Sequence, residues 1–173
     1  RHSFNLNVDW RYESGKRYNG PKFRGIPILE DLGINIDARA ISGRPYTRNI
    51  VPTPRGGSGF AGAINGARLP WRFFLNLKVD KNINLNRSEN SKKDLYLNVY
   101  FRAQNILDLR TVIGAYPVTG SADDSGYLVS PRGIQDINNI AVSGRDSEAY
   151  IDSFQWYVLN PDNYAPPRRL YLG

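Results

Sequence analysis

Two neighbouring carboxylates, Asp123 and Asp124, are the side chains of this chain best suited to chemistry, since they stand between glycines in GSADDSG. Carboxylate oxygens in a loop are ligands that Ca²⁺ prefers, but the spacing of a complete calcium loop is missing. Asp beside Gly is equally ordinary in a solvated turn. General acid–base catalysis needs a pocket that shifts a carboxyl pKa, and the sequence shows none. We expect no cofactor, with a Ca²⁺ loop as the alternative.

Other reactive patterns are weak. The chain has no Cys and a single histidine, His2, which argues against disulfides, thiolate metal sites, histidine zinc sites and a catalytic triad. Gly57, Gly59 and Gly62 form a G-x-G-x-x-G pattern, but a dinucleotide site needs a strand before it and a helix after it. Here Pro70 and a predicted strand follow, which favours a flexible loop. We expect the protein not to be an enzyme.

Composition narrows the class further. The chain carries 23 Lys and Arg against 16 Asp and Glu, a net charge of +7. These basic residues are scattered rather than striped, so nucleic acid is not an expected partner. No apolar stretch reaches the ~18 residues of a membrane-spanning helix. The chain begins inside a strand pattern without Met, and we therefore expect a fragment of a larger protein.

Strict alternation dominates the opening stretch, residues 2–14, where apolar or aromatic side chains at even positions face polar ones at odd positions. The same period recurs in residues 32–40, 71–85 and 95–107, and another such strand begins at 168–173. A period of two predicts strands whose faces meet different environments. The polar sides, expected to face a wet interior, carry Asn5, Asn7, Asp9, Arg11, Asn35, Asp37, Arg39, Arg72, Asn76, Lys78, Asn98, Arg102 and Gln104.

The length of these strands favours a membrane barrel. They run to about 10–15 residues, whereas strands of soluble proteins have about 5–6 and tilted transmembrane strands need about 9–11. Shifting strand 71–85 by one residue would turn Arg72, Lys78 and Asp80 to the apolar side. In lipid, each Lys or Arg near the midplane costs about 2–4 kcal/mol, so the membrane would fix the register. A long-stranded soluble barrel is the alternative.

The connections are of two kinds. Residues 86–94 form a short polar turn, whereas residues 43–70 and 108–167 are long and rich in Gly, Pro, Asn and Asp. Outer-membrane barrels have short periplasmic turns and long extracellular loops, so we expect the long segments outside the cell. Residues 15–31 are long for a periplasmic turn, and we expect part of them to extend the first strand.

The longest loop contains helix signals. Ser130 is a predicted N-cap with Pro131 at the first helical position. Farther on, Ile151, Phe154 and Tyr157 or Val158 are spaced as on a helix that ends at Asn160-Pro161. One or two short helices are expected, with an irregular aromatic loop as the alternative. The expected ligand or partner contacts are Tyr46, Phe60, Asp123, Asp124, Trp156 and Tyr157.

Aromatic residues fall at strand ends and on both faces. Those near the ends, such as Trp10, Tyr12 and Trp71, fit the interfacial girdles of a barrel. Tyr96 and Tyr100 lie on the polar side, which fits a filled or ligand-handling interior. Core packing of a soluble protein is the alternative.

Several stretches, in this order, resemble the C-terminal barrel of Bacteroidota TonB-dependent outer-membrane receptors: SGRPYTR, INGARLPW, LNVYFRAQNILD, GYLVSP and NPDNYAPPRRLYLG. The resemblance covers nearly the whole chain. It implies an all-β, antiparallel transmembrane barrel of about 22 strands with a plugged lumen, of which residues 1–173 supply about five or six strands and long extracellular loops. The resembling stretches include no carboxypeptidase-like domain, TonB box or plug, and no terminal aromatic residue, since the sequence stops at Gly173.

The resemblance implies a transport role. The parent protein would take up a scarce nutrient across the bacterial outer membrane. Its expected partners are outer-membrane lipid, the rest of the barrel and plug, the TonB system through the missing N-terminal part, and a surface lipoprotein or other outer-membrane proteins. One alternative is a structural barrel within an outer-membrane assembly, such as a secretion machine. Another is a soluble β-sandwich that binds sugars.

The two faces can be tested by a charge scan. We expect Leu75→Arg or Leu97→Arg to abolish outer-membrane assembly, because each would place a charge in hydrocarbon at a cost of about 2–4 kcal/mol. Asn76→Arg and Asn98→Arg should be tolerated. The measurement is the amount of protein in the outer-membrane fraction, and equal tolerance of all four changes would contradict the assigned faces.

Overall fold

The computed structural model describes residues 2–85 and 95–173. They separate into two compact units, here called the sheet unit and the loop unit. The sheet unit comprises Ser3–Ala40, Phe73–Leu109 and Pro166–Gly173, and the loop unit comprises the described residues of Arg1–His2, Ile41–Arg72 and Arg110–Ala165. The polar turn expected at residues 86–94 lies outside the described residues.

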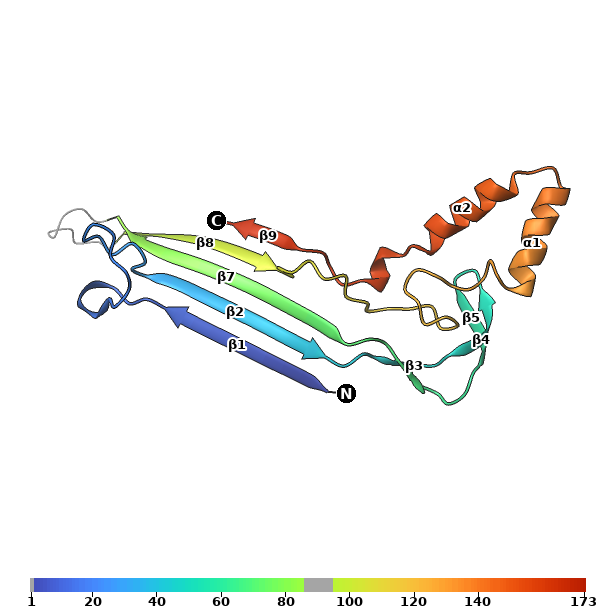
Figure 1. Ribbon diagram of the computed structural model, residues 1–173, viewed down its shortest axis with the longest axis horizontal. Helices are drawn as coiled ribbons and strands as arrows, with labels where there is room; N and C mark the ends of the chain where they lie inside the picture. The colour runs from blue at the N-terminus through green and yellow to red at the C-terminus, as the bar shows by residue number, and fades with distance from the viewer. Residues whose placement is uncertain (1, 86–94) are drawn as a thin grey trace. The chain divides into compact units, whose positions relative to one another are not determined.

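The sheet unit is built on one five-stranded sheet with the order β1-β2-β7-β8-β9. Neighbouring strands run in opposite directions (Figure 1), and antiparallel pairing joins β7 to β8 and β8 to β9. The strands are β1 Ser3–Arg11, β2 Leu32–Ile41, β7 Arg72–Asn84, β8 Tyr96–Gln104 and β9 Arg169–Leu172. The predicted strands are therefore confirmed, with slightly different ends.

The first strand is shorter than expected. It ends at Arg11, and residues 15–31 do not extend it. They begin instead with the 3-10 turn η1, Gly15–Arg17, where Gly15 has φ +60. A positive φ, which glycine adopts at little cost, turns the chain out of the strand direction. The expectation of a strand extension here was wrong for this reason.

The register between β7 and β8 sorts the side chains as the alternation predicts. Apolar pairs are Leu77 with Ala103, Val79 with Phe101, and Ile83 with Leu97. Polar or mixed pairs are Lys78 with Arg102, Asp80 with Tyr100, and Asn82 with Asn98. Lys81 is the exception, since it pairs with Val99 on the apolar side. Because side chains alternate strictly along a strand, this register gives the sheet one apolar face and one polar face.

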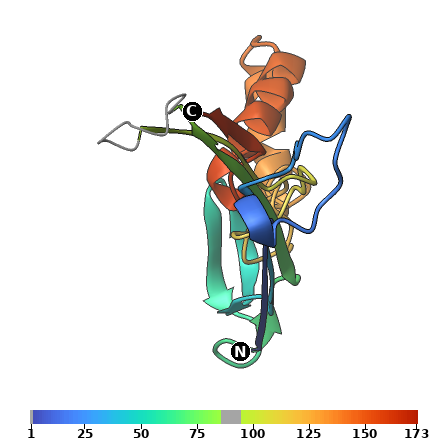
Figure 2. The same cartoon turned by 90° about the vertical axis from the view of Figure 1, so that its left-hand side faces the viewer.

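The sheet is a single layer, as the view along its strands in Figure 2 shows. Its apolar side chains are largely exposed: Phe4 62%, Trp10 60% and Leu170 59%. Among the described residues of this unit, Ala103 is the one hydrophobic side chain that is buried. Burying a large apolar side chain contributes about 1.5–3 kcal/mol, and this face forgoes that gain in water. A soluble sandwich would need a second sheet here, and the described residues of the unit form none.

The loop unit begins with two small hairpins. In one, β3 Pro45–Tyr46 pairs with β6 Ala67–Arg68, and in the other β4 Asn49–Thr53 pairs with β5 Gly56–Phe60. The flexible loop expected around Gly57 was therefore wrong, because Gly57 pairs with Pro52 in the β4–β5 ladder. Thr53 pairs with Gly56 across the turn. No helix follows this glycine pattern, so it lacks the strand–turn–helix context of a dinucleotide site.

Two helices confirm the signals in the longest loop. Helix α1, Pro131–Val142, starts at Ser130, whose Oγ accepts a hydrogen bond from the Gly133 amide at 3.1 Å. Helix α2, Ser147–Val158, is capped by Asp146, and the short η2, Pro161–Asn163, follows it. The alternative of an irregular loop was wrong. Neither helix among the described residues has the length and apolar character needed to span a membrane.

A small aromatic core holds the loop unit together. Tyr127, Phe154 and Val158 are buried, and the rings of Tyr127 and Phe154 stack with centroids 5.4 Å apart. The Tyr127 hydroxyl donates to Asp136 of α1, so the same residue ties α1 to α2. This packing holds α2 in place, and Tyr157 projects from its last turn. Among the described residues, antiparallel strands are the main secondary structure, and both α-helices belong to the loop unit.

Candidate functional site

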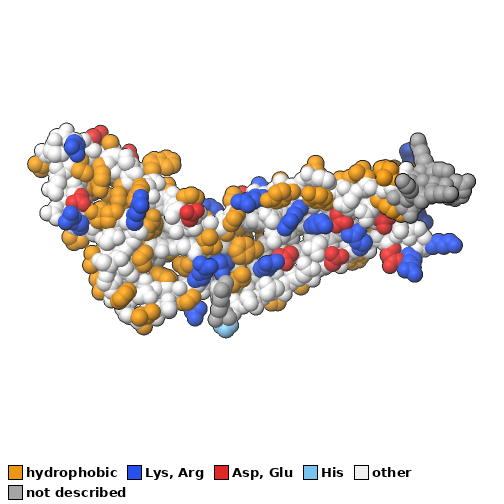
Figure 3. Space-filling view, turned by 180° about the vertical axis from the view of Figure 1, so that it is seen from behind, with side chains coloured by type: hydrophobic (Ala, Val, Ile, Leu, Met, Phe, Trp, Pro, Cys, Tyr) orange, Lys and Arg blue, Asp and Glu red, His pale blue; other side chains and the backbone are white. Residues whose placement is uncertain are grey.

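An ion cluster crosses the polar face of the sheet. The Arg11 guanidinium donates to Asp80 Oδ2 at 2.8 Å, and Lys78 Nζ lies 3.6 Å from Asp80 Oδ1. Asp80 is buried, at 7% exposed. Figure 3 shows one side of this unit, where charged side chains of both signs lie along the sheet among hydrophobic ones. Mutual pairing lets the buried carboxylate remain charged.

Gly33 makes this pairing geometrically feasible. Arg11 belongs to β1 and Asp80 to β7, with β2 between them. A Cβ at Gly33 would lie 2.5 Å from Arg11 Nη2 and 3.1 Å from Asp80 Oδ1. Because Gly33 has no side chain, the Arg11 guanidinium can pass over β2 at this position and reach Asp80.

Amide side chains continue the polar face along the strands. Asn35 Nδ2 donates to Asn7 at 3.2 Å and to Asp9 at 3.1 Å. Asn76 donates to Asp37 at 3.1 Å. Farther along, Asn98 donates to Asn82 at 2.6 Å. A hollow of about 270 Å³ opens among these side chains, lined by Asn7, Asn35, Asp37, Arg39, Asn76, Leu77, Lys78 and Arg102.

Nearly all residues predicted to face the interior share this polar surface. Asn7, Asp9, Arg11, Asp37, Arg39, Lys78, Asn98 and Arg102 all belong to the sheet unit, and each lies in the ion cluster, the amide network or the hollow. Arg72, the first residue of β7, is only 8% exposed and is not among the residues that line this hollow. Asn76 accepts from the Asn105 amide as well as donating to Asp37, so Asn76→Arg would break two contacts. Asn98 is consequently the cleaner control for the charge scan.

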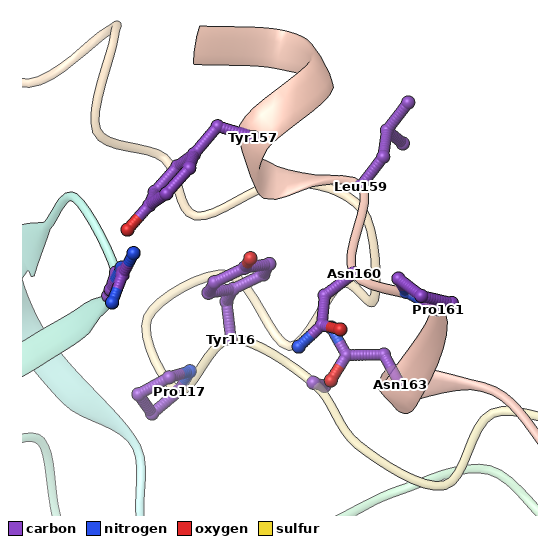
Figure 4. A pocket seen from close by; sticks show the side chains of 9 residues that line it. Tyr116, Pro117, Tyr157, Leu159, Asn160, Pro161 and Asn163 are labelled. Carbon is purple, nitrogen blue, oxygen red and sulfur yellow. The ribbon is translucent and has the colours of Figure 1, made fainter.

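The loop unit has its own hollow, of about 450 Å³, at the C-terminal end of α2. Tyr157 and Tyr116 face it from two segments (Figure 4), and the Arg55 guanidinium lies over the Tyr157 ring at 4.7 Å. Tyr116 is held in place because its hydroxyl donates to the Val158 carbonyl at 2.9 Å. The lining is completed by Ala115, Pro117, Leu159, Asn160, Pro161 and Asn163.

This hollow is partly aromatic. Its lining includes Arg55 and contains no acidic residue, although the Asp123 charge is near Tyr116. Burial raises the pKa of Tyr116, as does the nearby Asp123 charge, so this hydroxyl keeps its proton and its hydrogen bond. Rings, amides and one cation can bind a small polar ligand with an apolar face. Covalent catalysis typically uses a nucleophile paired with a base. The residues that line this hollow include no such pair.

A smaller hollow of about 220 Å³ shares Leu159, Asn160 and Pro161 with the first. Asp123 and Tyr164 line it, and the Tyr164 hydroxyl donates to Asp123 Oδ2. The hydrogen bond to that carboxylate raises the pKa of Tyr164, and burial adds to the shift. Arg110 covers the same ring at 4.5 Å.

The acidic pair does not assemble a calcium site. Asp123 accepts from Tyr164, while Asp124 Oδ1 accepts from the Gly126 amide at 2.7 Å, as in an ordinary Asx turn. Within residues 2–85 and 95–173, no group of His, Cys, Asp and Glu is arranged to hold a metal ion. Asp124 therefore lies in a turn of the expected kind, whereas Asp123 does not lie in a solvated turn, since its Oδ1 is buried.

The predicted loop contacts are only partly brought together. Tyr157 lines the larger hollow and Asp123 the smaller one. The remaining ones stand apart from both: Tyr46 lies against Gly120, Phe60 and Trp156 are exposed at 70% and 77%, and Asp124 caps its own turn. Sequence reasoning missed Arg55, Tyr116, Asn160, Asn163, Arg110 and Tyr164. The Asn160-Pro161 helix stop was the one local signal near them.

Compared with known proteins, the chain matches no family model, no curated protein and no solved structure. Its function is therefore inferred from the geometry of the polar face, the apolar face and the loop hollows.

Gly33→Ala should displace Arg11 from Asp80. The new methyl group would overlap the guanidinium, which ends a flexible side chain and can move aside, so the expected cost of about 1–3 kcal/mol is that of a buried carboxylate losing a hydrogen-bond partner. The measurement is the free energy of unfolding of the complete protein in denaturant, with Gly56→Ala as a control for glycine substitution outside the sheet unit, since a methyl group there makes only an ordinary contact. If Asp80→Asn is introduced first, Gly33→Ala should cost less, because the ion pair is already lost. Full additivity of the two changes would contradict the crossing.

The Tyr164–Asp123 pair should make the loop unit sensitive to alkali. A raised tyrosine pKa in the folded state gives stability that is complete below the ordinary value of 10.0 and is lost as pH rises through the folded value. Asp123→Asn should bring the Tyr164 pKa down, and Asp124→Asn should not. Tyrosinate absorbance, compared with that of Tyr164→Phe, measures the titration. Identical titrations in the two Asp variants would refute the pairing.

Proposed function

We propose that this chain is part of a TonB-dependent outer-membrane transporter and supplies barrel wall and outer loops for the uptake of a scarce nutrient. The observation that carries the proposal is the single-layer sheet with one exposed apolar face and one hydrogen-bonded polar face. Lipid covers the first face, and the second lines a water-filled lumen. The resemblance to Bacteroidota receptors supplies the transport class.

Strand lengths support a membrane-spanning role. Strands β1, β2, β7 and β8 have 9, 10, 13 and 9 residues. A tilted strand needs about 9–11 residues to cross hydrocarbon. The sheet still has two free edges, β1 and β9, and unpaired edges are not tolerated in lipid. Additional strands must close the barrel, and the resemblance implies about 22 in all.

The polar face supports passage of a polar solute. The amides of Asn7, Asn35 and Asn98 offer both donors and acceptors, and the charged groups of Arg11 and Asp80 pair with each other. A wall of this kind is hydrated without attracting one sign of charge strongly. It fits a lumen that transmits a solute better than one that holds it.

The loop unit supports a recognition role at the cell surface. In a barrel, long loops lie outside the cell, and this unit contains the two adjoining hollows around Leu159, Asn160 and Pro161. We assign the first contact with substrate to the larger hollow, with Arg55 and Tyr157 as the principal contacts.

A structural barrel within an outer-membrane assembly is the second candidate. The exposed residues of α1 and α2 favour it, since Val142 and Trp156 are 89% and 77% exposed. Such apolar residues on a surface fit a protein partner, for example a surface lipoprotein. The two candidates differ in whether energy from TonB is needed.

Genetics separates the two candidates. If the transporter proposal holds, deletion of the gene and loss of TonB should give the same growth defect on one limiting nutrient, and the double mutant should be no worse. The complete gene should encode a signal peptide, a TonB box and a plug domain of ordinary size, about 150 residues. A deletion defect that is independent of TonB would instead identify the scaffold.

Substitutions in the larger hollow test its assignment. On the nutrient identified by the deletion, Arg55→Gln and Tyr157→Ala should reduce uptake about tenfold each, the loss expected of a ligand contact that contributes about 1.4 kcal/mol. Trp156→Ala is the matched control, because Trp156 neighbours Tyr157 on α2 but does not line the hollow. Uptake of labelled nutrient at equal receptor levels is the measurement. Wild-type uptake in both hollow variants would refute the assignment.

A further inference from the structure

Residues 18–29 form a compact projection beyond the ends of the strands. A role in the barrel wall does not explain this projection. At its tip, Phe23 and Ile26 exchange two backbone hydrogen bonds, each 3.0 Å long. The residues between them, Arg24 and Gly25, have φ +50 and φ +81. Positive φ at both central positions is the geometry of a type I′ turn. The turn therefore presents Phe23 and Ile26 from a defined backbone, at 62% and 63% exposed.

Contacts within the sheet unit connect this projection to the apolar side of the sheet. Lys81, which lies on the apolar side of β7, donates through Nζ to the Ile28 carbonyl. Aromatic rings make a second connection. The ring centroid of Tyr12 lies 6.0 Å from that of Trp10 on the apolar face, and the ring centroid of Tyr18 lies 6.0 Å from that of Tyr12. The projection thus contacts the apolar face near the strand ends through Tyr18 and Ile28, while Pro27 also lines a hollow with Asn82 and Tyr96 of the polar side.

The charged side chains of the projection are all basic. Residues 18–29 contain Lys22 and Arg24 and no acidic residue. The Arg24 guanidinium lies 5.7 Å from the Phe23 ring centroid, so a cation and an apolar ring are presented together. The nearest acid along the chain, Glu30, accepts from the Gly15 amide. Exposed aromatic and aliphatic side chains flanked by basic ones are typical of segments that lie in a membrane interface.

We propose that residues 18–29 form an interfacial anchor that binds the anionic phospholipid surface at the periplasmic end of the barrel wall. Phe23 and Ile26 enter the headgroup region, and Lys22 and Arg24 pair with lipid phosphates. Lys81 extends from the apolar face toward the same boundary, as lysines near strand ends do. The anchor rests on the proposed transmembrane role of the sheet.

Site-specific fluorescence in the complete receptor tests the anchor. The chain has no Cys, so a cysteine introduced at one position gives this portion a single thiol for an environment-sensitive dye. The positions are Phe23→Cys and Ile26→Cys at the tip, Leu97→Cys on the apolar face and Asn98→Cys on the polar face. The receptor is reconstituted in phosphatidylcholine vesicles with and without phosphatidylglycerol. Lipids that carry a quencher near the headgroup report contact.

The expected result is quenching of the dye at 23 and 26, stronger with phosphatidylglycerol, and none at 98. Lys22→Glu with Arg24→Glu should remove the phosphatidylglycerol dependence at 26 and leave quenching at 97 by a deep lipid quencher unchanged. A dye at 97 that is quenched, with dyes at 23 and 26 that are not, overturns the anchor alone and indicates a protein partner for the projection. Absence of quenching at 97 overturns the transmembrane role itself.

Discussion

The fold depends on one constraint, which is that the apolar face of a single-layer sheet must be kept from water by something other than the sheet unit itself. Phe4, Trp10 and Leu170 are each more than half exposed. A globular domain would pack such residues against a second layer. In the proposed barrel, hydrocarbon would supply the missing layer without further protein, and it would do so for every strand at once. Lipid on one side and water on the other would then explain both faces.

The polar face has the opposite requirement, since its side chains must be held in place by polar interactions rather than by apolar packing. A lumen wall has no hydrophobic core to set its geometry, so hydrogen bonds and ion pairs must do so. Arg11 reaches across β2 to Asp80 only because Gly33 carries no side chain. A slip of any strand by one residue would bring charges to the apolar side and break this crossing as well. Register is therefore specified twice, once by each face.

The strands and the helices could be read from the sequence because both follow from local signals, a period of two and the cap at Ser130. The hairpin that carries Gly57 and the hollow around Tyr116 could not be read in this way. Gly57 pairs with Pro52, which lies close by along the chain, but glycine and proline are both depleted in strands, so no strand pattern marks this hairpin. The hollow joins Arg55 to Tyr157 across about a hundred residues of chain, and no periodicity records a contact of that kind.

Residues 15–31 show why the strand extension failed and what replaced it. A longer strand would have carried Tyr12 and its successors away from the sheet in an exposed edge, which lipid does not tolerate. Gly15 turns the chain instead, and Tyr18 returns to pack against Tyr12. The backbone polar groups at the tip are satisfied within the turn between Phe23 and Ile26. A segment that satisfies its own backbone there can place apolar side chains at a membrane boundary at little cost, which an irregular loop cannot.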